Sequence, residues 1–342
     1  MLQDWCTWDE DYNAVVQGIR SRLAALASSS QEFTTVLMQG SGTFSVEACI
    51  GTALPPDGKL LVLTNGHYGE RMALIAQRLG IALSVLDFSE TGPIDLEVVE
   101  RKLRTDAALT HMAVVHCETT TGMLNPLYEI GEIAARHGCI FIVDAMSSFG
   151  GIPLDMKLAR ADYLVSSANK CIQGTPGFGY VVAQRAVLAQ CPGQARSLSL
   201  DLYAQWLEME QNNGKWRTTS PTHVVRAFAQ ALDELEEEGG IAVRHARYRL
   251  NHHILVQGMR DLGFSTLLPN EHQSPIITAF HSPTHPAYDF QRFYRELKSR
   301  GFVIYPGKIT TADTFRIGNI GHVFPDDIRA LLQAVQESRY WL

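Results

Sequence analysis

The chain has 342 residues, of which 46% are hydrophobic and 19% charged, so it can bury a large core. Its net charge of −7 at pH 7, without a basic stripe, argues against a general nucleic-acid partner. No apolar run approaches the ~20 residues that a helix needs to span a bilayer. The acidic, aromatic amino terminus is also unlike a signal or transit peptide. These features indicate an enzyme-sized globular protein without a membrane partner.

The six cysteines lie far apart, with no Cys-x-x-Cys pair and no zinc-finger spacing. Several fall within apolar segments, where a free thiol behaves as a small hydrophobic group. The neighbours His252-His253 and His116-Cys117 are poor metal sites, because adjacent residues rarely converge on one ion. The pattern predicts a cytoplasmic protein with no metal site.

The first two thirds of the chain alternate between strand and helix patterns. Residues 11–29 carry apolar residues at helical spacing, a strand is expected over 34–38, and a helix begins near Phe44. Further strands are expected over 59–63, 82–87, 113–116, 140–143, 163–166 and 179–183, with helices over 69–79, 94–104 and 127–137. Short apolar strands separated by amphipathic helices predict an α/β fold with a mainly parallel sheet covered on both faces.

The character of the chain changes after a predicted helix over 224–238. The acidic run at 236–238 and the pair Gly239-Gly240 mark a boundary, and a long helix over 241–262 follows. Beyond it, strands are expected over 276–280, 303–305 and 314–317, with helices over 288–300 and 325–337. We therefore expect a large domain over residues 1–238 and a smaller C-terminal α+β domain over residues 239–342.

Two residues at strand ends carry the chemistry. Asp144 closes the apolar run 139–144, and Lys170 follows a second apolar run at 162–169. Alone, each is an ordinary strand-end carboxylate or surface amine. Together they are the two groups that a pyridoxal 5'-phosphate enzyme needs. A lysine bonds to the cofactor aldehyde, and an aspartate holds a proton on the ring nitrogen. The same lysine, once free, can move a proton as general base and acid.

A short turn is a candidate for the cofactor phosphate. Gly40-Ser41-Gly42-Thr43 joins a strand to a helix, where glycines let the backbone approach and the helix start attracts an anion. The alternative is that Ser41 and Thr43 serve only as helix caps. The turn therefore supports a phosphate site only in combination with Lys170.

Other candidates follow neighbouring strands. Tyr68 lies after the strand that ends near Thr64 and could stack on a flat ring, or be an ordinary loop aromatic. Thr119 and Thr120 follow the strand that ends at His116, and either hydroxyl could bond the phenolic oxygen of the cofactor. The sequence does not choose between these two threonines.

Arg316 lies inside an apolar strand of the smaller domain. A buried guanidinium is costly unless it meets an anion, and its planar fork suits a carboxylate or a phosphonate. The alternative is an internal salt bridge with an aspartate or glutamate. Arg316 is therefore the candidate for binding the acidic group of a substrate.

Five blocks of sequence resemble the class V, fold type I aminotransferases. They are residues 40–47, 65–71, 143–150, 166–179 and 315–319, in the family's order. The resemblance implies a large domain with a seven-stranded type of sheet, a pyridoxal phosphate cofactor and a homodimer. It adds Asn169 and Met146 to the cofactor site, with Met146 on the ring face opposite Tyr68. It also implies that Thr219 reaches the phosphate of the partner subunit's cofactor and that Arg316 binds the substrate anion.

Residues 4–9, 116–122 and 220–223 are similar more narrowly to 2-aminoethylphosphonate:pyruvate aminotransferases of phosphonate catabolism. This resemblance implies transfer of an amino group from 2-aminoethylphosphonate to pyruvate, which gives phosphonoacetaldehyde and L-alanine. A serine or alanine:glyoxylate aminotransferase, with the same catalytic set, is the alternative. Family members usually carry an upstream arm with a Thr-Pro-Gly-Pro-like turn, whereas this sequence starts at Met1. A non-catalytic homologue that lacks the arm is thus an alternative of another class.

Overall fold

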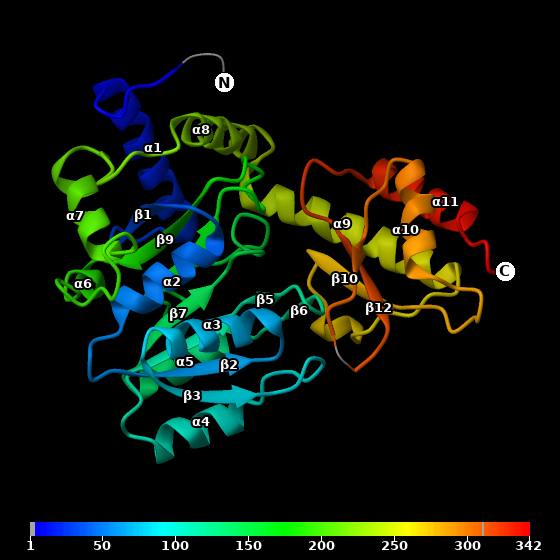
Figure 1. Cartoon of the computed structure of the whole chain (residues 1–342), viewed down its shortest axis with the longest axis horizontal. Helices are drawn as coiled ribbons and strands as arrows, with labels where there is room; N and C mark the ends of the chain where they lie inside the picture. Colours follow the sequence, from blue (N-terminus) through cyan, green and yellow to red (C-terminus); the bar gives the residue numbers. More distant parts are fainter. Residues whose placement is uncertain (1–3, 310) are drawn as a thin grey trace.

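The computed structural model describes residues 4–309 and 311–342. A large domain, built around a seven-stranded sheet, is joined to a smaller one by the long helix α9 (Gly240–Asp261) (Figure 1). The strands of the large sheet follow the order β1-β9-β8-β7-β4-β2-β3. They are β1 (Phe33–Gln39), β2 (Lys59–Thr64), β3 (Ala82–Asp87), β4 (His111–Val115), β7 (Ile140–Asp144), β8 (Tyr163–Ser167) and β9 (Phe178–Gln184).

The prediction of a mainly parallel sheet is confirmed. Strands β3, β2, β4, β7 and β8 pair in parallel, whereas β9 pairs antiparallel with both β8 and β1. Every residue of β4 and of β8 is buried, as expected for strands covered on both faces. The direction of β9 was not predictable, because a fully buried strand has the same apolar pattern whether it pairs parallel or antiparallel.

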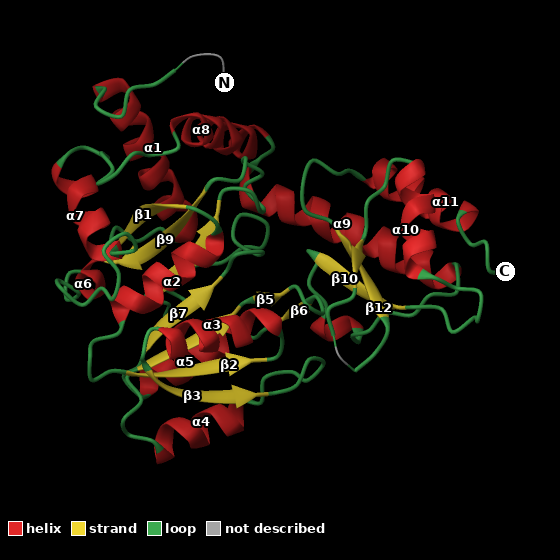
Figure 2. Cartoon of the chain, viewed as in Figure 1, coloured by secondary structure: helices red, strands yellow, loops and turns green. Residues whose placement is uncertain are grey.

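Helices surround the large sheet (Figure 2). They are α1 (Glu10–Ala27), α2 (Gly42–Ala53), α3 (His67–Arg78), α4 (Leu96–Thr105), α5 (Leu127–Arg136), α6 (Arg185–Leu188), α7 (Leu202–Gln211) and α8 (Thr222–Glu237). Local chemistry explains where α4 begins, since the Asp95 carboxylate accepts hydrogen bonds from the N–H groups of Glu97 and Val98. The helix then buries Val99 and Leu103, which lie on one face four residues apart.

The smaller domain has its own sheet and core. Strands β10 (Ile277–His281), β12 (Thr314–Gly318) and β11 (Tyr305–Pro306) pair antiparallel in that order, beside α10 (Phe290–Ser299) and α11 (Pro325–Glu337). The core is rich in aromatic side chains such as Phe264, Phe293 and Trp341. Within α9, Ile241 still packs on the large core, while Leu255 belongs to the small one. The boundary between residues 238 and 239 stays a prediction.

Several elements differ from the expectation, among them the short helix α6 (Arg185–Leu188), which was not predicted. The strand predicted over 303–305 covers only Tyr305–Pro306. The ribbon of β5 (Cys117–Glu118) and β6 (Met123–Leu124) was missed, because strands of two residues carry no readable period. Helix α7 was also missed, and only Leu202, Gln205 and Met209 of it are buried, which leaves a weak apolar pattern. Within the described ranges, no helix is long and apolar enough to cross a membrane.

Two helical glycines make a matched test of the packing. A Cβ added at Gly131 of α5 would lie 1.9 Å from the carbonyl oxygen of Ala159, whereas one at Gly18 of α1 would meet nothing within 4 Å. Gly131→Ala should therefore lower the free energy of unfolding by about 1–3 kcal/mol. Gly18→Ala should raise it by about 0.5–1 kcal/mol, because alanine favours helix. Urea unfolding of both variants checks this, and equal effects of the two substitutions would contradict it.

Candidate active site

The parallel pairing of β7 and β8 brings the two central residues together. Asp144 is the last residue of β7 and is paired with Val165 of β8, a few residues before Lys170. Since neighbouring parallel strands end at the same edge of a sheet, their following residues meet there. Asp144 and Lys170 both line a cavity of about 200 Å³ at this edge.

Most of the predicted cofactor residues line the same cavity. Its wall is formed by Ser41, Gly42, Thr43, Val46, Tyr68, Arg71, Met72, Asp144, Met146, Ser167, Asn169 and Lys170. These residues come from the segments that follow β1, β7 and β8, including the last residues of β7 and β8, and from the N-terminal halves of α2 and α3. Of the predicted set, Thr119, Thr120, Thr219 and Arg316 do not line this cavity.

The turn before α2 forms one end of the cavity. Ser41 is the N-cap residue of α2, but its side chain makes no capping hydrogen bond, so the cap-only interpretation of this hydroxyl is wrong. The N–H groups of Phe44 and Ser45 donate to the Ser41 carbonyl oxygen. Those of Gly42 and Thr43, at the very start of the helix, have no partner inside it. A Cβ on Gly42 would lie 2.2 Å from the sulfur of Met146, so an alanine here would require the flexible Met146 side chain to move.

Asp144 is a buried carboxylate with little compensation from its own chain. Its Oδ1 accepts a hydrogen bond of 2.9 Å from the Met146 N–H. Burial raises the pKa of Asp144 from 3.8 to about 6, although that hydrogen bond and the charges of Lys170 and Arg71 act to lower it. A carboxylate in this state is suited to a positively charged partner, which would bring its pKa down again.

A second buried carboxylate fixes the position of Tyr68. Glu118 Oε2 accepts hydrogen bonds from the N–H groups of Tyr68 and Gly69 at 3.1 and 3.4 Å, at the start of α3. Burial nevertheless raises the pKa of Glu118, and its hydrogen bonds oppose that rise. An anion at a helix N-terminus is stabilised by the helix dipole. Glu118 thereby holds Tyr68 at the edge of the cavity.

The structure separates the two threonines that the sequence could not rank. The Thr120 hydroxyl donates to Glu118 Oε1 at 2.6 Å and accepts from the His67 N–H at 3.1 Å, so it is occupied away from the cavities. Thr119 lines a second cavity, together with Tyr68 and Lys170. Thr119 therefore faces a cavity that Thr120 does not reach, and its contact with the cofactor stays a prediction.

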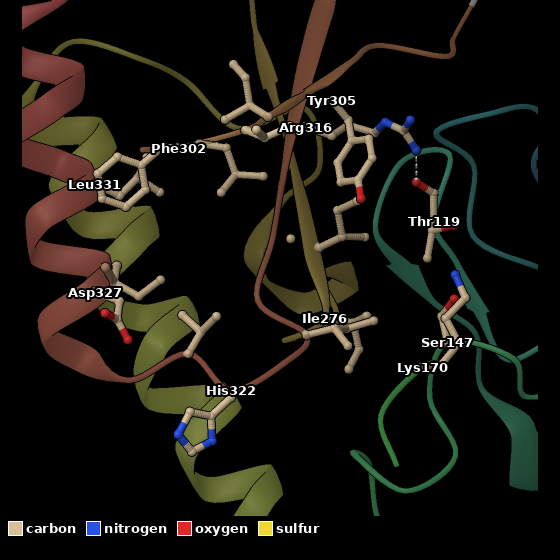
Figure 3. Close-up of a pocket in the computed structure, with 18 of the residues that line it drawn as sticks. Thr119, Ser147, Lys170, Ile276, Phe302, Tyr305, Arg316, His322, Asp327 and Leu331 are labelled. Carbon is tan, nitrogen blue, oxygen red and sulfur yellow. Dashed lines mark hydrogen bonds between the residues drawn. The ribbon is translucent and has the colours of Figure 1, made fainter. Parts of the chain in front are cut away.

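The second cavity lies between the domains and has a volume of about 620 Å³ (Figure 3). The large domain contributes Tyr68, Thr119, Ser147 and Lys170, and the small domain contributes Arg316 and a mostly apolar wall. Tyr68 and Lys170 line both cavities. They are thus placed to contact a cofactor on one side and a substrate on the other.

Arg316 crosses from the small domain to the large one. Its side chain is buried, its Nη1 donates to the Thr119 carbonyl oxygen at 2.7 Å, and its Nε donates to the Pro306 carbonyl oxygen at 3.1 Å (Figure 3). Among residues 4–309 and 311–342, the guanidinium forms no ion pair with a carboxylate, so the predicted alternative of an internal salt bridge is wrong. Burial lowers the pKa of Arg316, and an anion would offset that cost.

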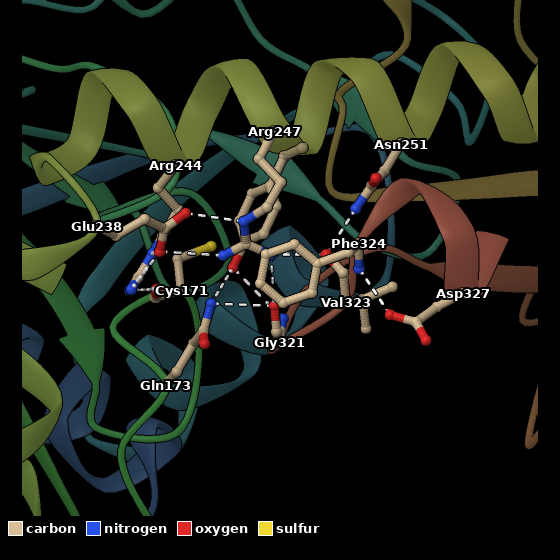
Figure 4. A network of polar contacts seen from close by, with 11 residues as sticks. Cys171, Gln173, Glu238, Arg244, Arg247, Asn251, Gly321, Val323, Phe324 and Asp327 are labelled. Atoms are coloured by element: carbon tan, nitrogen blue, oxygen red, sulfur yellow. Dashed lines mark hydrogen bonds and ion pairs between the residues drawn. The ribbon is translucent and has the colours of Figure 1, made fainter. Parts of the chain in front are cut away.

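A polar network joins the loop that carries Lys170 to the small domain (Figure 4). Gln173, three residues after Lys170, donates to the Gly321 carbonyl oxygen at 3.0 Å and to the Tyr248 hydroxyl at 2.9 Å. Arg247 of α9 donates to the carbonyl oxygens of Gly321 and Val323 at 3.0 and 2.7 Å. The segment that follows the Arg316 strand is therefore held to the segment that carries Lys170.

Sequence reasoning missed Arg71, whose Nη1 donates to the Thr43 hydroxyl at 3.1 Å and whose guanidinium lies 4.8 Å from the centre of the Tyr68 ring. Its spacing of three residues from Tyr68 on α3 was the available signal, because such residues share a helix face. Thr219 is exposed and lines neither cavity. Its predicted role toward a partner subunit therefore stays a proposal.

The donor set fits pyridoxal phosphate. The N-terminus of α2, the Ser41 and Thr43 hydroxyls and Arg71 suit a phosphate, and Asp144 suits a protonated ring nitrogen. Lys170 supplies the amine that bonds to an aldehyde. Tyr68 and Met146 supply flat and apolar surfaces for a ring.

This fold and this site define a pyridoxal-phosphate-dependent aminotransferase of fold type I. The chain belongs to the Aminotransferase class-V family, whose sequence profile matches residues 6–318. It is 64% identical over 340 residues to a 2-aminoethylphosphonate–pyruvate transaminase of Syntrophobacter fumaroxidans, covering 99% of this chain and 92% of that protein. A Vibrio cholerae protein of the same name is 59% identical over 342 residues, covering 100% of this chain and 93% of the relative.

Among solved structures, an alanine–glyoxylate aminotransferase from Nostoc sp. superposes with a TM-score of 0.90. The superposition covers 98% of this chain and 89% of that one, at 23% sequence identity. At this level of identity the likeness supports the fold, and the expected fold type is confirmed.

The raised pKa of Asp144 leads to a pH-dependent prediction for the cofactor-free protein. As pH rises from about 4 to about 6, the unfolded chain loses this proton before the folded chain does, so stability falls. An asparagine carries no such penalty. Asp144→Asn should match the wild type near pH 4 and exceed its unfolding free energy by up to about 3 kcal/mol at pH 7.

Urea unfolding of both cofactor-free proteins, at equal protein concentration and at both pH values, measures this difference. Asp162→Asn is the matched control, because burial raises the pKa of Asp162 to about 6 outside the two cavities, and its Oδ2 accepts from the Phe141 N–H. Adding pyridoxal phosphate should reverse the sign for Asp144→Asn only. A stability difference independent of pH would contradict the burial argument.

Proposed function

We propose that this chain transfers the amino group of 2-aminoethylphosphonate to pyruvate and gives phosphonoacetaldehyde and L-alanine. The observation that carries the proposal is the convergence of Lys170, Asp144 and Arg316 on adjoining cavities, in a chain 58–64% identical to proteins named for this reaction. Pyridoxal phosphate, when bound, supplies the aldehyde that exchanges amino groups and the ring that stabilises negative charge.

The protein's own residues supply binding and proton transfer. The start of α2, with Ser41, Thr43 and Arg71, would hold the phosphate, and Asp144 would keep the ring nitrogen protonated. The Lys170 amine can take a proton from the substrate carbon that bears the nitrogen. It can then return that proton to the cofactor carbon on the other side of the same nitrogen. Because Lys170 lines both cavities, it can reach both positions.

Arg316 would bind the acidic group of each substrate in turn. A ping-pong enzyme holds its two acids at one place, and the guanidinium can address the oxygens of either. Two N–H groups of Arg316 donate to backbone carbonyl oxygens, and the side chain, which lines the interdomain cavity, keeps further N–H donors for a substrate. Tyr68 lines both cavities, and Thr119 lines the interdomain one.

We also propose a cytoplasmic homodimer. All six cysteines, each within the described part of the chain, are free, which suits a reducing compartment. Thr219 is exposed at the start of the turn before α8, where a partner's site could use its hydroxyl. Mixing a Lys170→Ala chain with a Thr219→Ala chain tests this arrangement by subunit complementation.

The alternative donors are less well supported. The alanine–glyoxylate aminotransferase is 23% identical to this chain, far below the 64% of a 2-aminoethylphosphonate–pyruvate transaminase. A non-catalytic homologue would not need a buried carboxylate, an amine and an anion-binding guanidinium beside two adjoining cavities. The identity and the site therefore both favour the phosphonate reaction.

Incubation of the loaded enzyme with single amines tests the function. We expect 2-aminoethylphosphonate to change the visible absorbance of the bound cofactor and, with pyruvate, to give equal amounts of phosphonoacetaldehyde and L-alanine. L-Serine with glyoxylate should react at least about tenfold less efficiently, because serine carries no phosphonate. L-Alanine, the product of the proposed reaction, should also convert the cofactor and therefore does not discriminate. Preference for the glyoxylate pair would favour the alternative.

Lys170→Ala is the control for that assay, and it should lose multiple turnover and the adduct trapped by borohydride. Arginine at this position should not restore turnover, since it stays protonated.

Arg316→Lys should weaken both half-reactions together. Lysine keeps the charge but loses the planar fork, and the loss of one charge-assisted hydrogen bond costs about 1.5–3 kcal/mol. This corresponds to about one to two decades in kcat/KM for each half-reaction. Stopped-flow measurement of the two halves separately decides it. Slowing of the pyruvate half alone would show that the phosphonate is held elsewhere.

A further inference from the structure

A second cation reaches the interdomain cavity from the small domain. Lys308 lines this cavity together with Arg316 and Lys170. Its Nζ lies 3.5 Å from the Tyr68 hydroxyl, to which it donates, and 5.2 Å from the centre of the Tyr68 ring. The positive charges of Lys308 and Arg316 are thus both placed at the side of the cavity that faces Tyr68.

The backbone before Lys308 is held by the strand that carries Arg316. Pro306, at the end of β11, accepts the hydrogen bond from Arg316 Nε at 3.1 Å. The next residue, Gly307, donates its N–H to the Thr314 carbonyl oxygen of β12 at 2.9 Å. A Cβ on Gly307 would lie 2.3 Å from the Thr314 hydroxyl, so this close approach requires glycine. One short turn therefore positions both cations.

The two substrates of the proposed reaction differ in the charge of their acidic groups. A carboxylate has one negative charge and two oxygens, which a single guanidinium can satisfy. A phosphonate resembles a phosphate monoester, with three oxygens and more than one negative charge near neutral pH. Bound to Arg316 alone, it would leave one oxygen and part of its charge without a partner.

We propose that Lys308 is a specificity-determining residue that binds the additional charge of the phosphonate and is dispensable for the carboxylate of pyruvate. The inference rests on the proposed function. Lys308 is exposed, and its flexible stem carries a compact charge in solvent, so it costs little when the smaller acid is bound. When the phosphonate substrate binds to the cofactor-loaded protein, the Lys308 ammonium moves from the Tyr68 hydroxyl to the third phosphonate oxygen.

Separate measurement of the two half-reactions tests whether Lys308 contributes to the phosphonate half-reaction alone. Lys308→Met should lower kcat/KM for 2-aminoethylphosphonate about tenfold, the scale of one lost charge-assisted contact. The half-reaction with L-alanine or pyruvate should change less than about twofold. Lys308→Arg should keep most of the phosphonate activity. Lys298→Met is the matched control, because Lys298 is an exposed lysine in the last turn of α10 that lines neither cavity.

Two non-reacting probes test the charge dependence directly. Ethylphosphonate and ethylsulfonate have the same shape and three oxygens, but the sulfonate carries only one charge. Calorimetry on the loaded enzyme, at a pH above the second pKa of ethylphosphonate, should show tighter binding of ethylphosphonate to the wild type and to Lys298→Met. Lys308→Met should lose that preference about tenfold. Equal loss for both probes, equal slowing of both half-reactions, or no change in Lys308→Met would overturn the proposal.

The probes also separate this inference from the proposed function. If 2-aminoethylphosphonate does not react with the loaded wild type, the proposed function fails. The comparison of ethylphosphonate with ethylsulfonate still shows whether Lys308 binds the second negative charge of a phosphonate.

Discussion

The parallel pairing of β7 with β8 is the constraint on which the site depends. It sets Asp144 opposite Val165 and so brings the carboxylate and the following Lys170 to one edge of the sheet. Strand β2 ends at the same edge and leads to Tyr68, and β4 leads to Thr119. Because all four strands are parallel, their carboxyl ends lie at the same edge of the sheet. The candidate site residues therefore meet there, although they are distant in sequence.

Three buried charges beside this edge are compensated in different ways. Glu118 accepts backbone N–H groups at the start of α3, and Arg316 donates to two backbone carbonyl oxygens. Asp144 has a single backbone N–H, from Met146, and its pKa is raised to about 6 by burial. A buried charge without a full set of partners is costly. At Asp144, a cationic cofactor ring would remove this cost.

The second domain completes the site rather than merely covering it. It brings Arg316 to the Thr119 carbonyl oxygen. The hydrogen bonds of Gln173 and Arg247 to Gly321 fix the position of the loops of the two domains relative to each other. Such contacts make the distance between Lys170 and Arg316 a property of the domain interface. Any movement of one domain relative to the other would change that distance directly.

The sequence by itself determined the alternation of strands and helices, and it marked Asp144 and Lys170, because apolar periodicity and strand-end polar residues are local signals. Blocks of family resemblance added the cofactor and the reaction. Only the tertiary structure decided that Thr119 rather than Thr120 faces the cavity, since Glu118 holds the Thr120 hydroxyl. It also decided the direction of β9 and the approach of Lys308 to Tyr68, residues separated by most of the chain. Such choices depend on contacts between remote segments, which no local pattern encodes.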